Sequence, residues 1–294
     1  MRRPGILRAL LAAAIFACLL PGGAGPALAA PPLSVYGNLP GFEMAALSPS
    51  GTRIALLHGF TQTGRSWGTV AAALTAAGHE VVTVDMPGHG GSGAVRADLP
   101  TSADLVTTAA GRAVYVGYSM GGRVALHAAL RAPALVRGLV LIGATAGIDD
   151  EAERATRRAA DEVLAADLER DGLDVFLTRW LASPLFATLP RAAAGMDERR
   201  MNCVDGLAAS LRLCGTGTQD PLWERLAAIA CPVAILAGSF DDKFRALGRQ
   251  LAASIGPNAT FTSIGHAGHA AHLERPDAVV AAISGLAELV ALAG

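Results

Sequence analysis

Three residues with the side chains of a serine-nucleophile site follow one another in the order serine, aspartate, histidine. Ser119 lies within the pentapeptide GYSMG (residues 117–121), which is a G-x-S-x-G pattern. A serine hydroxyl becomes reactive when a histidine takes its proton and a carboxylate orients that histidine. Asp241 and His269 occur later in the chain in the order that this arrangement requires. We therefore predict that Ser119, Asp241 and His269 form a catalytic triad.

Two of these positions have close competitors in the sequence. Asp242 is adjacent to Asp241, although neighbouring residues in a turn point in different directions. His266 and His272 lie three residues before and after His269. A metal site is conceivable around the three histidines, but no aspartate or glutamate joins them at ligand spacing. We favour Asp241 and His269, and we predict neither a metal nor a cofactor.

Acyl or proton transfer at such a serine also needs two backbone N–H groups that stabilise a developing oxyanion. The first is expected from Met120, the residue after the nucleophile. The second is expected from the loop that reads HGFT (residues 58–61). Gly59 lets the backbone turn the next amide inward, which makes Phe60 the predicted donor.

Short apolar runs alternate with helical stretches from about residue 53 onward. The runs are aliphatic or β-branched and are bounded by glycine, proline or polar residues, which is typical of buried parallel strands. The predicted strands are Ile54–Leu57, Val81–Asp85, Ala113–Gly117, Leu139–Gly143, Val233–Ala237 and Ala259–Ile264. Strands that alternate with helices predict a mostly parallel, doubly wound α/β sheet. In this setting the GYSMG turn leads from a strand into a helix, as an α/β-hydrolase fold requires.

The stretch at about 148–220 interrupts this alternation. It contains no convincing strand, is rich in charged residues, and carries Trp180 among helical patterns. An insertion after the carboxyl end of a strand lies over the ligand-binding edge of the sheet. We therefore predict a helical cap within a hydrolase domain that spans 54–294.

The first thirty residues differ in composition from the remainder. Three arginines precede an apolar run of about twelve residues, and an A-x-A pattern follows at residues 27–29. This is typical of a secretory signal peptide, and the run is too short for a membrane span, which needs ~20 residues. We predict a signal peptide at 1–30, an N-terminal extension at 31–53, and export to the periplasm or the medium. If the leader is a start-site or fusion artefact, the protein is cytoplasmic.

Composition narrows the range of partners. The chain has 294 residues, of which 52% are hydrophobic and 17% charged, and its formal net charge is −1. A chain of this length and composition can bury a large core, and the absence of a basic block disfavours nucleic acid as a partner. Three cysteines follow the leader and contain no C-x-x-C pair, so their disulfide state stays open. The oligomeric state also stays open.

From about Leu56 to its end, the chain resembles the 2-succinyl-6-hydroxy-2,4-cyclohexadiene-1-carboxylate synthases of menaquinone biosynthesis. The motifs that carry the resemblance are HGFT (58–61), DMPGHG (85–90), GYSMGGR (117–123), FLTRW (176–180), DDKFRAL (241–247) and AGH (267–269). The resemblance implies a lyase that eliminates pyruvate from 2-succinyl-5-enolpyruvyl-6-hydroxy-3-cyclohexene-1-carboxylate, with the serine triad serving proton abstraction.

A substrate with several carboxylates requires cationic partners, and arginine binds a carboxylate through two parallel hydrogen bonds. The resemblance implies that Arg123, Arg157 and Arg200 bind these carboxylates, with Arg154 as the alternative to Arg157. It also implies that Tyr118 and Trp180 line the pocket.

Two observations keep other functions open. Residues 33–55 resemble the opening of the propeller domain in prolyl-oligopeptidase-type peptidases, and an exported chain is at odds with a cytosolic intermediate as substrate. The alternative is an exported carboxylesterase in which Ser119 forms an acyl-enzyme. A third hypothesis, a non-catalytic module with a hydrolase fold, is disfavoured by the complete set of Ser119, Asp241 and His269.

Overall fold

The computed structural model describes residues 32–37 and 51–292. The predicted signal peptide lies outside the described residues, as do residues 38–50 of the predicted extension. No helix within the described ranges is long and apolar enough to cross a membrane.

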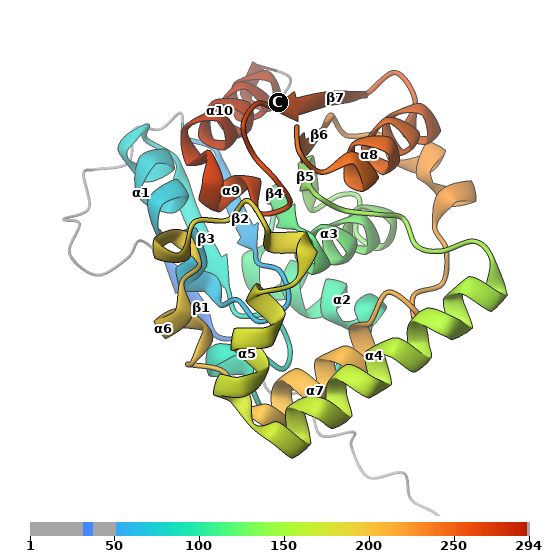
Figure 1. The fold of residues 1–294 in the computed structure, drawn as a ribbon. Helices are drawn as coiled ribbons and strands as arrows, with labels where there is room; N and C mark the ends of the chain where they lie inside the picture. Colours follow the sequence, from blue (N-terminus) through green and yellow to red (C-terminus); the bar gives the residue numbers. More distant parts are fainter. Residues whose placement is uncertain (1–31, 38–50, 293–294) are drawn as a thin grey trace, which may run out of the picture. The chain divides into compact units, whose positions relative to one another are not determined.

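A seven-stranded sheet forms the centre of the described part, in the order β1-β3-β2-β4-β5-β6-β7 (Figure 1). All neighbouring strands are parallel except β1, which pairs antiparallel with β3. The strands are β1 Val35–Gly37, β2 Arg53–Leu57, β3 Glu80–Val84, β4 Ala113–Tyr118, β5 Val136–Ile142, β6 Val233–Gly238 and β7 Ala259–Ile264. The predicted mostly parallel α/β sheet is confirmed, and every predicted strand lies within a few residues of an observed one.

The two edges of the sheet differ from the prediction. β1 comes from the N-terminal extension, where no strand was predicted, because three residues are too few for a periodic signal. Its neighbour Leu33 is buried against the core. At the other edge, β7 was predicted to be buried, but only Ile264 of its six residues is. An edge strand has one neighbour only, so less of its surface is covered.

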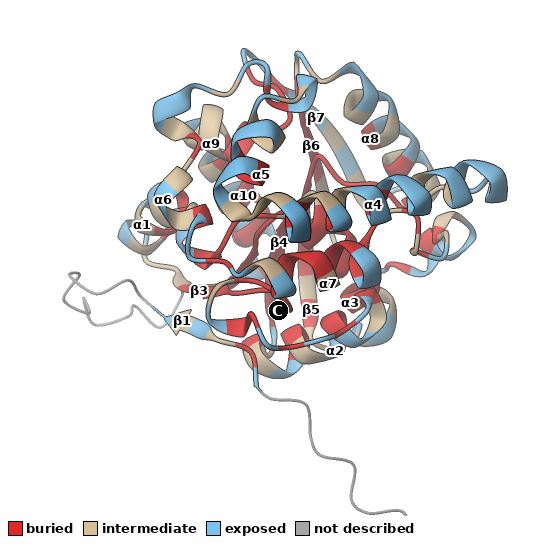
Figure 2. Cartoon of the chain, turned by 60° about the horizontal axis from the view of Figure 1, so that its bottom comes forward, coloured by how far each residue is buried: buried red, intermediate tan, exposed pale blue. Residues whose placement is uncertain are grey.

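Helices cover both faces of the sheet. The apolar side chains of α2 (Leu99–Ala110), α3 (Met120–Arg131) and α8 (Asp242–Ile255) pack on one face. Those of α1 (Gly68–Ala76) and α10 (Pro276–Leu292) pack on the other. Burial is accordingly concentrated in the strands and in the helix faces turned toward them (Figure 2). Burying apolar surface on both faces stabilises the sheet and holds the strand ends in fixed positions.

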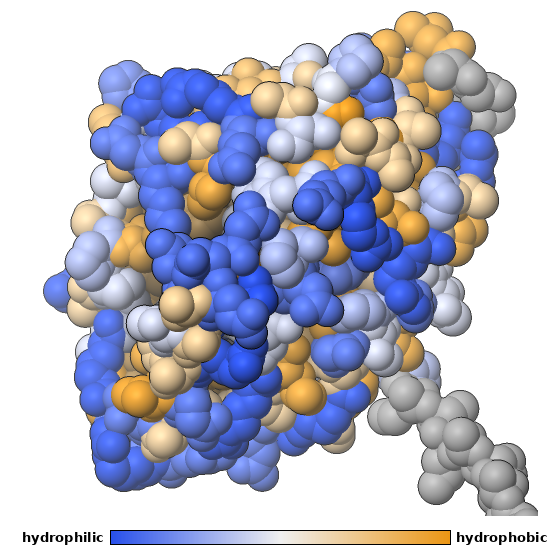
Figure 3. Space-filling model, turned by 90° about the vertical axis from the view of Figure 1, so that its right-hand side faces the viewer, coloured by the Kyte–Doolittle hydropathy of each residue, from blue (hydrophilic) through white to orange (hydrophobic). Residues whose placement is uncertain are grey.

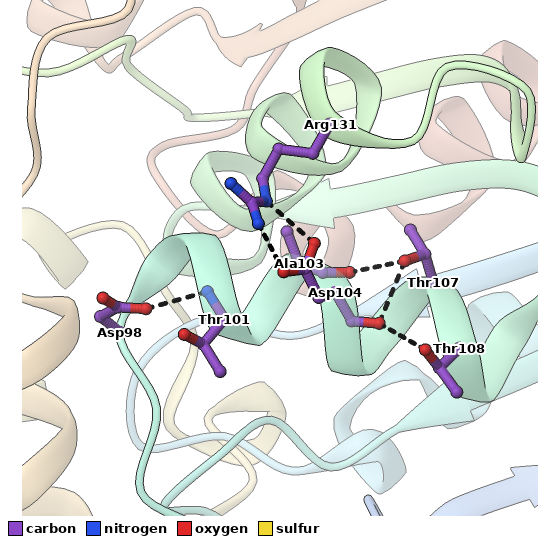
Figure 4. Close-up of polar contacts among 7 residues, drawn as sticks. All are labelled: Asp98, Thr101, Ala103, Asp104, Thr107, Thr108 and Arg131. Atoms are coloured by element: carbon purple, nitrogen blue, oxygen red, sulfur yellow. Dashed lines mark hydrogen bonds and ion pairs between the residues drawn. The ribbon is translucent and has the colours of Figure 1, made fainter.

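The helix that carries the GYSMG turn at its start is tied at its far end to α2 (Figure 4). Two bonds join the guanidinium of Arg131 to the carboxylate of Asp104, at 2.9 and 2.6 Å. Asp98 caps α2 by accepting a hydrogen bond from the Thr101 amide at 2.9 Å. The Arg131–Asp104 pair is exposed and lies at the end of α3 that is remote from the turn, so it joins the two helices at the surface without reaching the turn.

Between β5 and β6 the chain is helical. The helices are α4 Glu151–Asp171, α5 Leu173–Leu181, α6 Met196–Arg199 and α7 Val204–Cys214, with short 3₁₀ turns among them. The α4 and α7 helices lie side by side along one border of this insertion (Figure 1). Phe176 and Leu207 belong to its own small apolar cluster. We refer to residues 148–220 as the cap.

The face in Figure 3 is mostly hydrophilic, with apolar residues between the polar ones. Among the described residues, the cysteines Cys203, Cys214 and Cys231 are free thiols.

Candidate active site

The nucleophile candidate lies in a sharp turn between β4 and α3. Ser119 has φ 51° and ψ −107°, a conformation that costs energy in a residue with a side chain. The turn is possible because glycines surround it. A Cβ on Gly117 would lie 2.4 Å from the carbonyl oxygen of Gly121, and one on Gly121 would lie 2.2 Å from that of Leu57. Any other residue at these two positions would force the turn open.

The structure brings Ser119, His269 and Asp241 together from three separate segments. The Nε2 atom of His269 lies 3.2 Å from the Oγ of Ser119, and its Nδ1 lies 2.8 Å from Oδ2 of Asp241. The other carboxylate oxygen of Asp241 accepts a hydrogen bond from the Phe244 amide at 3.2 Å, at the start of α8. Since a carboxylate accepts the Nδ1 proton, Nε2 is left to accept the serine proton.

His269 is buried and held by its surroundings. The Phe244 ring lies with its centroid 4.4 Å from the imidazole centroid, and the Tyr118 ring lies at 5.3 Å. Its loop is fixed by Glu274, which accepts a hydrogen bond from the Gly268 amide at 2.9 Å. The imidazole therefore stays between its two partners without having to be ordered when a substrate binds.

The aspartate and the two histidines that were alternatives for the triad make other contacts. The side chain of Asp242 is 91% exposed and pairs with Arg245 at 2.8 Å. His266 stacks its ring edge against Phe240. His272 is buried behind the site, where its Nε2 accepts a hydrogen bond from the side-chain amide of Gln62 at 3.0 Å. Within residues 32–37 and 51–292, no group of three histidines, cysteines or acids could hold a metal ion.

The two residues predicted to supply the oxyanion donors, Phe60 and Met120, both line the cavity that contains Ser119. Met120 is the first residue of α3, so its N–H is one of the amides that a helix leaves without an internal acceptor. Gly59 lies so close that a Cβ there would be 2.6 Å from the Tyr118 ring and 3.5 Å from Cβ of Ser119. Phe60, the next residue, lines the same cavity as Ser119.

A cavity of about 170 Å³ opens at Ser119 and His269. Its walls come from both the sheet edge and the cap. Phe60, Tyr118 and Met120 contribute from the sheet side, and Trp180 and Phe186 from the cap. The indole nitrogen of Trp180 is buried and has no hydrogen-bond partner among the described residues. An unpaired buried donor at a cavity is available to an acceptor on a ligand.

Two of the predicted arginines line this cavity. Arg123 is 7% exposed and reaches only the Gly215 carbonyl at 3.4 Å and the Gln219 side chain at 3.5 Å. Burial lowers its pKa to about 10, so the guanidinium remains charged at neutral pH. Arg157 also lines the cavity, and its Nε pairs with the buried Asp161 at 2.8 Å. Arg123 thus has no carboxylate partner within the described part of the chain.

Arg200 and Arg154 are not brought to the cavity. Arg200 is exposed and pairs with Asp174 at 2.7 Å and Asp197 at 3.0 Å. Arg154 donates to the carbonyl groups of Ile148 and Asp149 near the start of α4.

Two charged residues near the site were not singled out from the sequence. Lys243 lines the cavity beside Phe244. Its position two residues after Asp241 could have indicated from the sequence that it lies near the site. Arg199 is 1% exposed and reaches the loop that holds Phe60, through a hydrogen bond to Thr61. No sequence signal separates it from its exposed neighbour Arg200.

The chain is similar in sequence to known proteins. A profile of the alpha/beta hydrolase family matches residues 54–282. The chain is similar to the 2-succinyl-6-hydroxy-2,4-cyclohexadiene-1-carboxylate synthase of Salmonella schwarzengrund, with 35% identity over 249 residues that cover 82% of this chain and 96% of that protein.

Solved structures show the same similarity. MenH from S. aureus superposes with a TM-score of 0.78 at 29% identity, covering 88% of this chain and 98% of that one. A thermophilic esterase from Thermogutta terrifontis superposes with a TM-score of 0.71 at 23% identity, over 88% and 93% of the two chains, which is a likeness of fold alone.

Proposed function

The chain belongs to the alpha/beta hydrolase family and, within it, to the 2-succinyl-6-hydroxy-2,4-cyclohexadiene-1-carboxylate synthases, and on this premise we propose that it is a lyase of menaquinone biosynthesis. It eliminates pyruvate from 2-succinyl-5-enolpyruvyl-6-hydroxy-3-cyclohexene-1-carboxylate.

The change from a 3-ene to a 2,4-diene defines the bonds that break. A proton leaves ring carbon 2, which is next to the ketone of the succinyl group. The ring double bond moves, and the bond from carbon 5 to the enolpyruvyl oxygen breaks. The released enolpyruvate takes up a proton and becomes pyruvate. The enzyme must therefore supply a base at carbon 2 and stabilise negative charge on the ketone oxygen.

Each requirement has a candidate group at the site. Ser119, with its proton taken by His269, is the proposed base, and Asp241 keeps the imidazole oriented. The amides of Phe60 and Met120 are the proposed donors to the enolate oxygen.

The observation that carries the proposal is the charge of the cavity. Arg123, Arg157 and Lys243 line it together with the single acid Asp161. The substrate brings three carboxylates, and a buried cation without a partner is costly unless a ligand pairs with it. Arg123 is therefore the cation that we assign most directly to a substrate carboxylate.

The same triad could serve a carboxylesterase in which Ser119 forms an acyl-enzyme, because its hydrogen bonds suit acyl transfer equally well. An esterase acting on neutral esters has no use for a buried cation beside the nucleophile, so the substitution Arg123→Ala separates the two functions.

We expect Arg123→Ala to lower kcat/KM for pyruvate release on the order of 100-fold, because the loss of a charged, bidentate contact costs about 3 kcal/mol. Hydrolysis of a short neutral ester should change little. The matched control is Arg131→Ala, at the exposed end of the same helix, which should leave pyruvate release unchanged. An equal loss in both variants, or none in Arg123→Ala, would contradict the assignment.

A further inference from the structure

The loop that carries the Phe60 amide contains a strained residue. Residues 59–62 form a turn in which the Gln62 amide donates to the Gly59 carbonyl at 3.1 Å. Thr61, in the third position, has φ 68°. A positive φ in this position is the requirement of a type II turn and normally selects glycine. A β-branched residue in this conformation is a genuine outlier, so other contacts must hold it there.

All three polar groups of Thr61 are engaged. Its amide donates to Nε2 of His89 at 3.3 Å, and its carbonyl accepts from the side chain of Asn202 at 2.8 Å. Its hydroxyl oxygen accepts a hydrogen bond from the guanidinium of Arg199. Arg199 and Asn202 both belong to the cap, so two of the three contacts come from the cap.

The side chains of Arg199 and Asn202 are buried. Arg199 is 1% exposed and also donates to the Ala194 carbonyl at 2.8 Å. Among the described residues, no carboxylate lies within ion-pair distance of Arg199. Asn202 is 6% exposed, and its Oδ1 accepts from the Gly90 amide at 2.9 Å. Asn202 therefore joins the cap, the turn at 59–62 and the loop after β3 through one side chain.

We propose that Arg199 and Asn202 are positioning residues for the oxyanion hole, and that they act by holding Thr61 in its left-handed conformation so that the neighbouring Phe60 amide faces Ser119. The cap thus completes the oxyanion hole in addition to covering the cavity. The proposal rests on the proposed role of Phe60.

Four variants distinguish a role of the cap residues in positioning the Phe60 amide from a role in the stability of the whole fold. Arg199→Met and Asn202→Ala remove the two cap contacts. Thr61→Gly removes the hydroxyl but adopts a positive φ without strain, so it should fold as well as the parent. Thr61→Ser retains the hydroxyl and should retain function. The control is Arg191→Ala, an exposed arginine in the same part of the cap.

The first measurement is the rate at which a fluorophosphonate labels Ser119 in the purified full chain. The Oγ–phosphorus bond forms, fluoride leaves, and the serine proton passes to His269, while the phosphoryl oxygen occupies the oxyanion hole. We expect labelling to slow about tenfold or more in Arg199→Met and Asn202→Ala, because the loss of a whole donor costs on the order of 100-fold or more. Thr61→Gly should label like the parent, because glycine adopts the positive φ without the Arg199 contact. Thr61→Ser and Arg191→Ala should also label like the parent.

The second measurement is hydrogen exchange of a peptide that covers residues 58–62. Exchange should accelerate in Arg199→Met and Asn202→Ala, while Thr61→Gly should exchange like the parent and melt within a few degrees of it. Unchanged labelling in both Arg199→Met and Asn202→Ala, slow labelling without faster exchange, or slow labelling in Thr61→Gly would overturn the proposal. So would a parent protein whose Ser119 is never labelled.

Pyruvate release distinguishes this proposal from the proposed function. If the parent protein is labelled and the variants slow as expected, but no pyruvate is released, the lyase assignment fails while the role of the cap residues stands. If pyruvate is released, its kcat should fall in Arg199→Met and Asn202→Ala with KM nearly unchanged, since an oxyanion contact forms chiefly in the transition state.

Discussion

Among single residues, Asp241 and its neighbour Asp242 differ in what their side chains contact. Asp241 is bonded to the imidazole of His269, whereas Asp242 points into solvent. We expect Asp241→Asn to lower kcat on the order of 10³- to 10⁴-fold, because the wrong histidine tautomer is then favoured. Asp242→Asn should leave kcat within about twofold of the parent. Steady-state kinetics on the two variants checks this, and similar losses in both would contradict the assignment.

Individual residues were predictable from the sequence where a backbone pattern surrounds them. The glycines of GYSMG and the order of serine, aspartate and histidine led to Ser119, Asp241 and His269, which the structure brings together. The roles of the cap arginines were harder to predict from the sequence, because no motif of glycines or fixed residue order surrounds an arginine in a helix. Arg199 and Arg200 are adjacent, yet one is buried against Thr61 and the other is exposed, and only the packing of α6 separates them.

At the scale of elements, the loops after β2 and β3 are joined through buried neutral histidines. His58 accepts a hydrogen bond from the Met86 amide at 3.0 Å, and His89 accepts one from the Thr61 amide at 3.3 Å. Burial lowers the pKa of His58 to about 4 and that of His89 to about 3. Both rings therefore remain neutral in the folded protein at pH values where they are protonated in the unfolded chain.

This difference predicts a loss of stability in acid. A histidine with a lowered pKa makes the folded state less stable as pH falls below about 6.5, down to the folded pKa near 4 or 3. Each ring contributes a slope of up to about 1.4 kcal/mol per pH unit. Urea unfolding at pH 7, 6 and 5 should show this decline, and His58→Gln should make it shallower. A free energy of unfolding that is constant between pH 7 and 5 would contradict the conclusion that His58 and His89 are buried as neutral rings.

Among the elements, long strands were predictable and short ones were not. Ala259–Ile264 has the predicted bounds, and Ala113–Tyr118 differs from its predicted bounds by one residue, since an apolar run sets each of them. β1 escaped prediction because its three residues owe their extended form to pairing with β3. Pairing between distant segments is a tertiary effect, and local sequence carries little signal for it.

At the scale of the whole molecule, the leader at 1–30 remains a proposal outside the described residues. We propose that it directs export, and that the mature chain begins near Ala30. Expression of the full chain in a bacterium, followed by fractionation and N-terminal sequencing, tests this. A full-length product in the cytoplasm would contradict it and would remove the conflict between an exported enzyme and a cytosolic substrate.

We propose that Ser119 acts as a base in an elimination and not as a nucleophile in acyl transfer. The most direct measurement is a single turnover of the purified protein with 2-succinyl-5-enolpyruvyl-6-hydroxy-3-cyclohexene-1-carboxylate, followed by pyruvate release and by the intact mass of the enzyme. We predict stoichiometric pyruvate, no adduct at any time point, and no pyruvate above background with Ser119→Ala. An acyl adduct on Ser119, or a parent enzyme that releases no pyruvate, would contradict the account.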